Sequence, residues 1–556
     1  MESNLRMLLA IILSFLVFLI YQIFFAKPPQ MPKDQQGEQS QQIQEQVVPD
    51  KNVQPLKEPT ATMEEPVVRP ALPVQSKKII VSTPLYIASF IEEGATLTGF
   101  ELTRYRETVQ PDSPRKVLIS AQSRDEYSLG VGFVNHTVQG LDDAVFHSDT
   151  AKKVIEASHK QESLSFSWES PQGYRITKTY TFYPDSYLFD LDVKVGNPSA
   201  DAIKDSLTLA LVYPKTNILA SGYIFSGPAI LLDNELKEIT KKKVAKKNIY
   251  SGHIGWIALE SGYFVTALIP DGAGKVASAR LERDPEHFLK AFYIDPADSI
   301  LPQTERIYHY QIYMGPKSLD ILSNTNKELA RVIDFGWFDI IAKPLLHILN
   351  FFNRYVHNYG IAIIILTILI KIAFWPLTNK SYQSMSDMKK LQPKITELRQ
   401  KYKNDKQKMN QELMNLYRTY NINPLGGCLP MILQIPVFFA FYKMLYQAIE
   451  LRHAPFVGWI NDLSAPDRLF HFNFSIPYMK PPYGIPVLTI IMGASMFVQQ
   501  KMAPPPGDPT QAKFMMAMPI IFTFIFINFP SGLVLYWLFN NILSIVQQYY
   551  ITKKTA

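Results

Sequence analysis

A chain of 556 residues is longer than one hydrophobic core normally uses, so several domains are expected. Its single cysteine, Cys428, excludes an intrachain disulfide and a thiolate metal cluster, and the histidines show no ligand spacing such as HExxH. The net charge of +7 is modest, and long apolar runs at the N-terminus and in the C-terminal third flank a more polar middle. This profile indicates a membrane protein that carries a soluble domain, and we expect no metal or other cofactor.

The N-terminal segment predicts an uncleaved membrane anchor followed by a tether. Residues 7–25 are an uninterrupted apolar run of 19 residues without a small-x-small cleavage site. We therefore expect a signal-anchor span over residues 1–26. Residues 27–76 are rich in Pro, Gln, Glu and Lys and poor in large apolar side chains. Such a segment cannot bury enough surface to fold, which predicts a flexible linker.

The middle block, residues 77–332, alternates apolar and polar side chains, as half-buried β-strands do. Leu164, Phe166 and Trp168 alternate with serines, and a turn signal at 171–173 leads into the next run. Further alternating positions are Tyr174, Ile176, Lys178, Tyr180, Phe182, Tyr187, Phe189, Leu191, Val193 and Val195. Many short strands separated by turns predict a large antiparallel β-sandwich domain.

Three segments within or after this block do not alternate, and they predict a loop and two helices instead of strands. The lysine-rich stretch 241–247 is expected to be a solvated loop, and the polar segment 319–332 a helix. From residue 335 to residue 357, apolar side chains recur at helical spacings, with Pro344 expected to kink the segment. This predicts an amphipathic helix over residues 333–357 that lies in the membrane surface. A core helix of the β-domain is the alternative.

Five apolar segments follow within residues 358–550, and each predicts a membrane span. They cover residues 359–378, 428–449, 485–500, 514–529 and 533–549. The third and fourth of them, at about 16 residues, reach only about 24 Å, which is less than a hydrocarbon core of ~30 Å. Such short spans thin the bilayer locally. With the N-terminal anchor, the total is six spans.

Lys371 interrupts the first of these five segments. An ammonium near mid-membrane costs about 2.5–3.5 kcal/mol, so such residues usually face water or a partner and mark a functional site. The alternative is that the side chain snorkels to the interface, which lies about 10 Å further along the helix.

The charges of the loops predict the topology. The loop 380–424 holds ten Lys and Arg against four acids, whereas the loop 452–484 holds three against two. An excess of Lys and Arg in a short loop marks the cytoplasmic side. Six spans then place both termini in the cytoplasm, together with the short basic tail 551–556. The β-domain is expected in the periplasm.

The cytoplasmic loop 380–424 carries two runs of apolar residues at alternating spacings of three and four. The positions are Met388, Leu391, Ile395, Leu398 and Tyr402, then Met409, Leu413, Leu416 and Tyr420. This pattern predicts a helical hairpin with an apolar seam and basic outer faces. The basic faces could bind nucleic acid such as ribosomal RNA, or serve orientation only.

Three motifs resemble the YidC family of membrane protein insertases in their order and spacing. They are NPLGGCLP (423–430), PFVGWINDLSAPD (455–467) and FPSGLVLYW (529–537). The anchor, linker and β-domain resemble the Gram-negative type, and the β-domain resembles a sugar-binding super-sandwich without a convincing pair of catalytic carboxylates. The resemblance implies a multi-pass protein of the bacterial inner membrane that is not an enzyme. It would insert and chaperone nascent membrane proteins, alone or with the Sec translocon, with the ribosome and the lipid bilayer as further partners.

The resemblance also implies a hydrophilic groove that is open to the cytoplasm and to lipid and contains one intramembrane cation. Lys371 occupies that position, where many members of the family carry arginine. The implied groove residues are Lys371, Thr367, Gln434, Gln499 and Trp537. An apolar slide along the third and fifth spans of the chain would include Ile435, Phe438, Met492 and Phe526. Recruitment by the hairpin would involve Met385, Met388, Lys389, Lys390, Lys394 and Arg399.

The residues leave alternatives open for these assignments. Gln434 could instead form a helix–helix hydrogen bond, and the slide residues could be ordinary packing. For the whole chain, the alternatives are a transporter and a membrane-anchored periplasmic carbohydrate-binding protein.

Overall fold

The computed structural model describes residues 76–213, 225–271, 276–283, 289–326, 328–403, 405–420, 429–502 and 509–555. The predicted signal anchor, the linker up to residue 75 and positions 423–428 of the NPLGGCLP motif lie outside the described residues. The described residues all belong to one compact unit, Pro73–Ala556.

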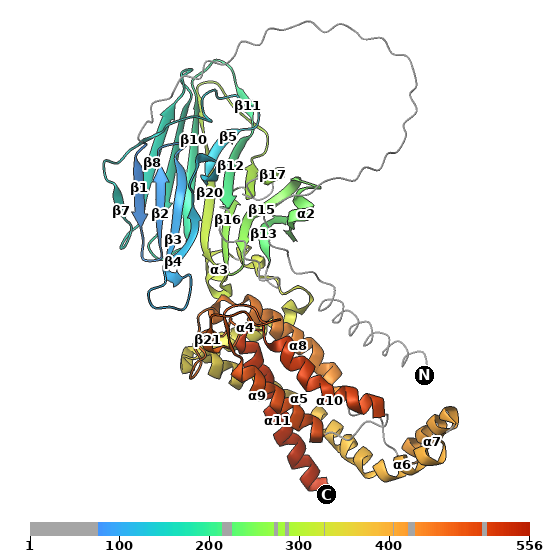
Figure 1. Cartoon of the computed structure of the whole chain (residues 1–556). Helices are drawn as coiled ribbons and strands as arrows, with labels where there is room; N and C mark the ends of the chain where they lie inside the picture. Colours follow the sequence, from blue (N-terminus) through green and yellow to red (C-terminus); the bar gives the residue numbers. More distant parts are fainter. Residues whose placement is uncertain are drawn as a thin grey trace, which may run out of the picture. The chain divides into compact units, whose positions relative to one another are not determined.

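The β-rich part of the chain, drawn from blue to yellow-green in Figure 1, consists of two main sheets packed face to face. The first sheet has the order β4-β3-β2-β1-β7 and is antiparallel except for the pair β1 and β7. Its strands are β1 (Lys78–Ser82), β2 (Tyr86–Ile91), β3 (Thr96–Arg106), β4 (Arg115–Ser120) and β7 (Val154–Glu156).

The second sheet contains 13 strands within the described residues. Its main order is β5-β12-β18-β17-β15-β16-β20-β10-β9-β8-β6, and β13 and β14 extend from β15. The strands are β5 (Gly130–Phe133), β6 (His147–Ser148), β8 (Glu162–Glu169), β9 (Arg175–Phe182), β10 (Leu188–Asn197), β12 (Leu207–Tyr213), β13 (Ser226–Leu232), β14 (Glu235–Glu238), β15 (Ile249–Ser261), β16 (Phe264–Pro270), β17 (Val276–Arg283), β18 (Leu289–Ile294) and β20 (Thr304–Pro316). A separate ribbon pairs β11 (Ile203–Asp205) with β19 (Asp298–Ile300), and η1 (Arg124–Glu126) is a single helical turn.

The apolar side chains of the predicted alternating pattern point between the two sheets and form the core there. On β10 the alternating buried side chains include Phe189, Leu191, Val193 and Val195. Aromatic rings from both sheets meet there, with a centroid distance of 4.6 Å between Phe90 and Tyr180. Each such pair contributes about 0.5–1.5 kcal/mol beyond its buried area. The large β-rich domain and its sandwich packing are therefore confirmed.

Two of the predicted segments differ in detail. The lysine-rich stretch begins with a short helix, α2 (Lys241–Val244), although Lys246 and Lys247 are exposed as expected for solvated residues. The predicted helix over 319–332 is two short helices, α3 (Leu319–Thr325) and η3 (Leu329–Val332). They are separate because the backbone of Asn326 is extended, with φ −151°.

The C-terminal part is helical, as the apolar segments predicted. Its elements are η4 (Gly336–Phe338), α4 (Asp339–Val356), α5 (Tyr359–Lys390), α6 (Gln392–Lys401), α7 (Lys406–Thr419), α8 (Leu429–Gln447), η5 (Ile449–Leu451), α9 (Val487–Met502), α10 (Pro509–Phe526) and α11 (Ser531–Thr555), with the hairpin β21 (Leu469–Phe472) and β22 (Tyr483–Ile485) before α9. Within the described residues, α5 is the one helix both long and apolar enough to cross a membrane, and Met515–Phe526 is a shorter apolar helix. The count of six spans stays a prediction.

Helix α4 has two apolar faces. One face is buried and packs against α5 and α8 through Leu345, Leu346 and Leu349. The other face is exposed and includes Ile340, Phe351 and Tyr355. Because its buried face packs on helices, α4 is not a core helix of the β-domain, and its position in the membrane surface stays a prediction.

Candidate functional site: a polar strip between apolar helices

Helix α11 carries a strip of buried polar side chains inside an otherwise apolar segment. Its members are Asn541, Ser544, Gln547 and Gln548, together with the half-buried Asn540. They lie three or four residues apart, or next to one another, so they share one side of the helix. These residues were not predicted from the sequence, although polar residues at helical spacing in an apolar run were the signal that could have revealed them.

Each member of the strip contacts a neighbouring helix. Ser544 and Gln547 bond to α5, Asn540 to α8, and Asn541 and Gln548 to α9. The hydrogen bonds are Lys371 Nζ to Ser544 Oγ (2.7 Å), Gln547 Nε2 to Thr378 Oγ1 (2.8 Å), Gln434 Nε2 to Asn540 Oδ1 (2.8 Å), Asn541 Nδ2 to Ser495 Oγ (3.0 Å) and Gln548 Nε2 to the carbonyl oxygen of Met502 (3.0 Å). Such bonds between membrane helices contribute about 0.6 kcal/mol each on average, so α11 joins the bundle through polar contacts.

Lys371 lies inside the bundle, with only 7% of its surface exposed. Its ammonium donates to the neutral Ser544 hydroxyl, which in turn donates to the carbonyl oxygen of Asn540 at 2.7 Å. Among the residues that the structure describes, no carboxylate forms an ion pair with Lys371. The side chain points toward α11 rather than toward the end of α5, which disfavours snorkelling.

The other predicted groove residues are only partly brought together. Gln434 joins the polar strip through Asn540, which is the helix–helix bond considered as its alternative. Thr367 is buried on the Lys371 side of α5 and donates to the carbonyl oxygen of Ile363 in its own helix. Gln499 is half-buried near the end of α9. A groove open to the cytoplasm stays a prediction.

Trp537 lies with the predicted slide residues rather than with Lys371. Its ring is 4.7 Å from that of Phe438 and 5.2 Å from that of Phe526, so the three form an aromatic cluster between α8, α10 and α11. Ile435 is exposed, Phe438 is half-buried, and Phe526 is buried. Met492 is buried on α9, which corresponds to the fourth predicted span, and therefore lies outside the third and fifth predicted spans that were expected to form the slide.

Two of the sequence motifs form one junction at the start of α11. The amide nitrogens of Ser531 and Gly532 donate to the carbonyl oxygens of Ala465 (2.8 Å) and Leu463 (2.9 Å). A Cβ on Gly532 would lie 3.1 Å from the Leu463 carbonyl oxygen, so this close approach favours glycine. The motifs 455–467 and 529–537 thus fix where α11 begins.

Asp467, at the end of the second motif (455–467), connects the same loop to α9. It is buried, accepts from Trp459 Nε1 at 2.6 Å, and accepts from the amide nitrogens of Leu488 and Thr489 in the first turn of α9. A carboxylate that satisfies free amides at a helix start stabilises that start by about 1 kcal/mol.

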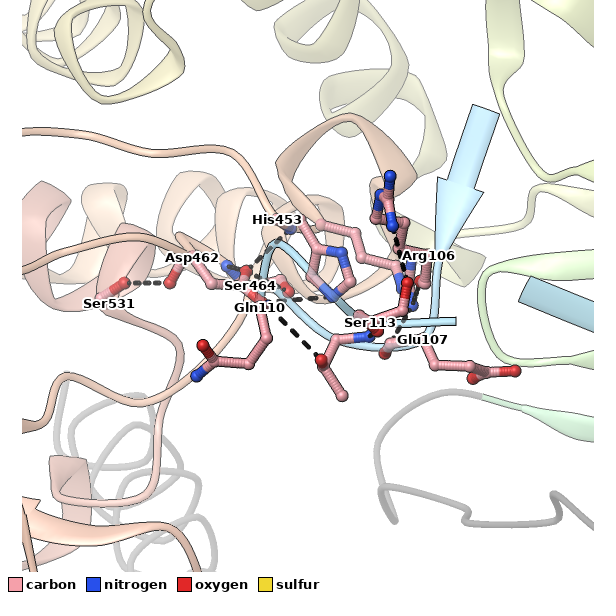
Figure 2. A network of polar contacts seen from close by, with 10 residues as sticks. Arg106, Glu107, Gln110, Ser113, His453, Asp462, Ser464 and Ser531 are labelled. Carbon is pink, nitrogen blue, oxygen red and sulfur yellow. Dashed lines mark hydrogen bonds and ion pairs between the residues drawn. The ribbon is translucent and has the colours of Figure 1, made fainter. Parts of the chain in front are cut away.

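The loop after α8 also contacts the β-domain. Figure 2 shows the chain around Arg106 and Glu107, at the end of β3, beside His453 and Asp462. Arg452 donates to the carbonyl oxygens of Arg106 (2.6 Å) and Glu107 (3.1 Å). These contacts join the β-domain to the helical part at the loop that carries the second motif.

His453 is expected to make this contact sensitive to pH. Burial and the charge of Arg452 lower the pKa of His453, against the opposing effects of Asp462 and Glu107. Because the folded pKa lies below the unfolded value of about 6.5, the unfolded loop binds the proton first, and local stability falls as the pH drops below about 6.5. Hydrogen exchange of residues 452–463 should therefore be faster at pH 5.5 than at pH 7.5, at matched intrinsic rates.

The matched variant is His453→Asn, because asparagine does not titrate and tolerates the left-handed backbone found at this position (φ 60°). It should abolish the pH dependence of exchange. An unchanged dependence in the variant would contradict this role of His453.

Helices α6 and α7 pack through a small separate core. Leu391, Ile395 and Leu413 are buried there, with Leu398, Met409, Leu416 and Tyr417 beside them. Of the predicted recruitment residues, Lys389, Lys390 and Lys394 are exposed, whereas the remaining three are half-buried, namely Met385, Met388 and Arg399. The basic side chains thus surround an apolar seam, while the cytoplasmic position of these helices stays a prediction.

Comparison with known proteins identifies the family. Residues 351–556 match the family described as 60Kd inner membrane protein, and residues 78–348 match the family described as YidC periplasmic domain. A relative from Syntrophobacter fumaroxidans and one from Syntrophus aciditrophicus, both called Membrane protein insertase YidC, are each 43% identical over 99% of both chains. A solved structure of an active YidC insertase with its first transmembrane domain resolved is 19% identical, covers 85% of this chain and 92% of its own, and superposes with a TM-score of 0.39.

Relatives of this identity and coverage establish both the resemblance and the insertase function expected from it. The chain belongs to the YidC family of membrane protein insertases.

Proposed function

We propose that the insertase works through a hydrophilic groove whose central group is Lys371. The observation that carries this proposal is a buried ammonium with a neutral partner, Ser544, on a helix apolar enough to span a membrane. Within the described part of the chain, no acid neutralises it through an ion pair. A carboxylate in a substrate would therefore meet an available counter-charge at a depth where acids otherwise cost about 2.5–3.5 kcal/mol.

The groove would lower the barrier that a polar substrate tail meets in hydrocarbon. Polar groups of the α11 strip would replace part of the tail's water. The short helix α9, with 16 residues, reaches about 24 Å, so the bilayer around it would be thinner and the remaining path shorter. The apolar substrate segment would leave past Ile435 and Phe438 into lipid, driven by about 25 cal/mol per Å² removed from water. No covalent bond forms or breaks in this scheme, so the protein is not an enzyme.

The topology and partners follow from the same scheme. Six spans would place both termini and the α6–α7 pair in the cytoplasm, and the β-domain in the periplasm of the inner membrane. The basic residues around the α6–α7 core would recruit the ribosome or the emerging substrate. The insertase would act alone or with the Sec translocon, and it would also chaperone folding.

Site-specific photocrosslinking to a stalled nascent membrane protein tests this scheme. Probes at Lys371, Ile435 and Phe438 should crosslink to the substrate at intermediate chain lengths, whereas a probe at Lys394 should crosslink at shorter lengths. The matched control is Ile372, which follows Lys371 on α5, points about 100° away from it around the helix, and has 61% of its surface exposed. We expect Ile372 to crosslink to lipid and not to substrate.

Equal substrate crosslinking from Ile372 and Lys371 would overturn the groove. Crosslinks at Lys371 that appear before any at Lys394 would contradict recruitment through the α6–α7 pair.

A further inference from the structure

The hairpin that precedes α9 exposes aromatic side chains. This aromatic hairpin, defined as residues 469–485, comprises β21, a long turn and β22. The exposed fractions are 67% for Phe470, 63% for Phe474 and 92% for Tyr478. Large aromatic side chains normally contribute to a core or an interface, so three of them exposed within nine residues indicate an interaction surface.

Hydrogen bonds hold the base of the aromatic hairpin. The buried guanidinium of Arg468 donates to the carbonyl oxygens of Pro482 and Ile527, both at 2.8 Å. The side chain of Asn528 donates to the carbonyl oxygen of Tyr478 at 2.7 Å and accepts from the amide nitrogen of Lys480 at 2.8 Å. The turn is thus bonded to the residues that follow α10, and its aromatic side chains are presented on a preorganised support.

The backbone is strained at two of the three aromatic positions. Phe470 and Tyr478 have positive φ values, 52° and 64°, in the left-handed region that disfavours bulky residues. A fold maintains such strain where the surrounding structure overdetermines it, and strain of this kind clusters at functional sites. Here it accompanies aromatic side chains that are exposed and not buried.

The position and composition of the hairpin indicate a lipid partner. Its second strand ends at Ile485, just before α9 begins at Val487, and the first exposed residues of α9 are Ile490 and Ile491. The end of a spanning helix lies at the membrane–water interface, where aromatic side chains are enriched. Residues 469–485 contain no Asp or Glu, so nothing in the hairpin repels anionic headgroups.

We propose that the aromatic hairpin is a membrane anchor that inserts Phe470, Phe474 and Tyr478 into the headgroup region of the outer leaflet. Through Arg468 and Asn528, it would hold the ends of α9 and α10 at a fixed depth. This inference rests on the proposed topology, in which α9 and α10 span the bilayer and the hairpin faces the periplasm.

Fluorescence in vesicles tests the anchor. The chain has one cysteine, so Cys428→Ser gives a background for single cysteines labelled with an environment-sensitive dye. Positions 474 and 478 report the hairpin. Val276 on β17 and Ile520 on α10, each 60% exposed, are matched references for water and hydrocarbon. The purified full chain is placed in phosphatidylethanolamine–phosphatidylglycerol vesicles that carry a spin label either near the headgroup or near the chain end.

We expect blue-shifted emission at 474 and 478 relative to 276, with stronger quenching by the shallow label than by the deep one. At 520, the deep label should quench more strongly. Emission at 474 and 478 like that at 276, with 520 in hydrocarbon, would overturn the anchor alone. Emission typical of water at 520 would overturn the span assignment and the anchor with it. A blue shift that grows with the ratio of protein to lipid would show a protein partner instead, which would also overturn the anchor.

Discussion

Replacing Lys371 by alanine should reduce insertion of a substrate with an acidic translocated tail by about tenfold, and that of a neutral counterpart by much less. A tenfold loss corresponds to about 1.4 kcal/mol, roughly half of what an acidic side chain costs at mid-membrane. We assign only half of this cost to Lys371, because the groove also supplies polar contacts that Lys371→Ala leaves in place. The measurement is the inserted fraction of paired substrates that differ only by Asp→Asn in the tail.

Two further variants separate charge from position. Lys371→Arg keeps the charge and should retain most of the activity, since a longer donor can still reach the region of Ser544. Ser544→Ala removes the hydroxyl that accepts from Lys371 at 2.7 Å but keeps the ammonium. If charge is what matters, Ser544→Ala should preserve the preference for acidic tails. Equal losses for acidic and neutral substrates in Lys371→Ala would contradict the electrostatic role.

The strands of the β-domain were predictable because their signal is local. On β8, β9 and β10, side chains that alternate in sequence alternate in burial, and the burial depends on the two sheets alone. Lys178 followed the same alternation and is fully buried. Its ammonium donates to the carbonyl oxygens of Gly94, Ala95 and Leu129, more than 45 residues away in the sequence. No local pattern could have found those partners.

The helical part was also predictable in outline, because long apolar segments are a local signal in the sequence. Mean hydropathy finds an apolar segment but averages over its polar positions, so the strip from Asn540 to Gln548 was hidden within the last predicted span. Helix α5 continues 12 residues beyond Thr378, because no glycine or other helix breaker follows the apolar run. Trp537 was expected beside Lys371, but its neighbours are Phe438 and Phe526, which depend on how three helices pack.

A buried ion pair in the β-domain is expected to make a large contribution to the stability of that domain. Glu260, on β15, pairs with Lys317, directly after β20, and their side chains are 0% and 5% exposed. Burial raises the pKa of Glu260, and the charge of Lys317 opposes that rise. The next residue, Ser318, donates to Glu450 in the loop after α8 at 2.9 Å. The pair therefore lies next to the contact between the β-domain and the helical part, and we expect it to stabilise the chain there.

Glu260→Gln should destabilise the β-domain by about 3–5 kcal/mol, because it leaves a buried ammonium without its counter-charge. For a domain of this size, the midpoint of thermal unfolding should fall by roughly 10 °C. Circular dichroism of the full chain in detergent, followed at the β-sheet signal, measures this midpoint. The matched control is Glu305→Gln at the exposed pair with Lys194 (2.7 Å), where we expect a loss of less than about 1 kcal/mol.

The double variant Glu260→Leu/Lys317→Met distinguishes charge pairing from shape. Replacing both members of a buried pair by apolar residues of similar volume is often neutral or stabilising, so the double variant should regain most of the lost stability. A double variant as unstable as Glu260→Gln would show that the geometry of the polar contact, and not the balance of charge, holds the two strands together. A single variant as stable as the parent chain would show that water reaches Lys317 when Glu260 is removed, which would contradict the burial on which the prediction depends.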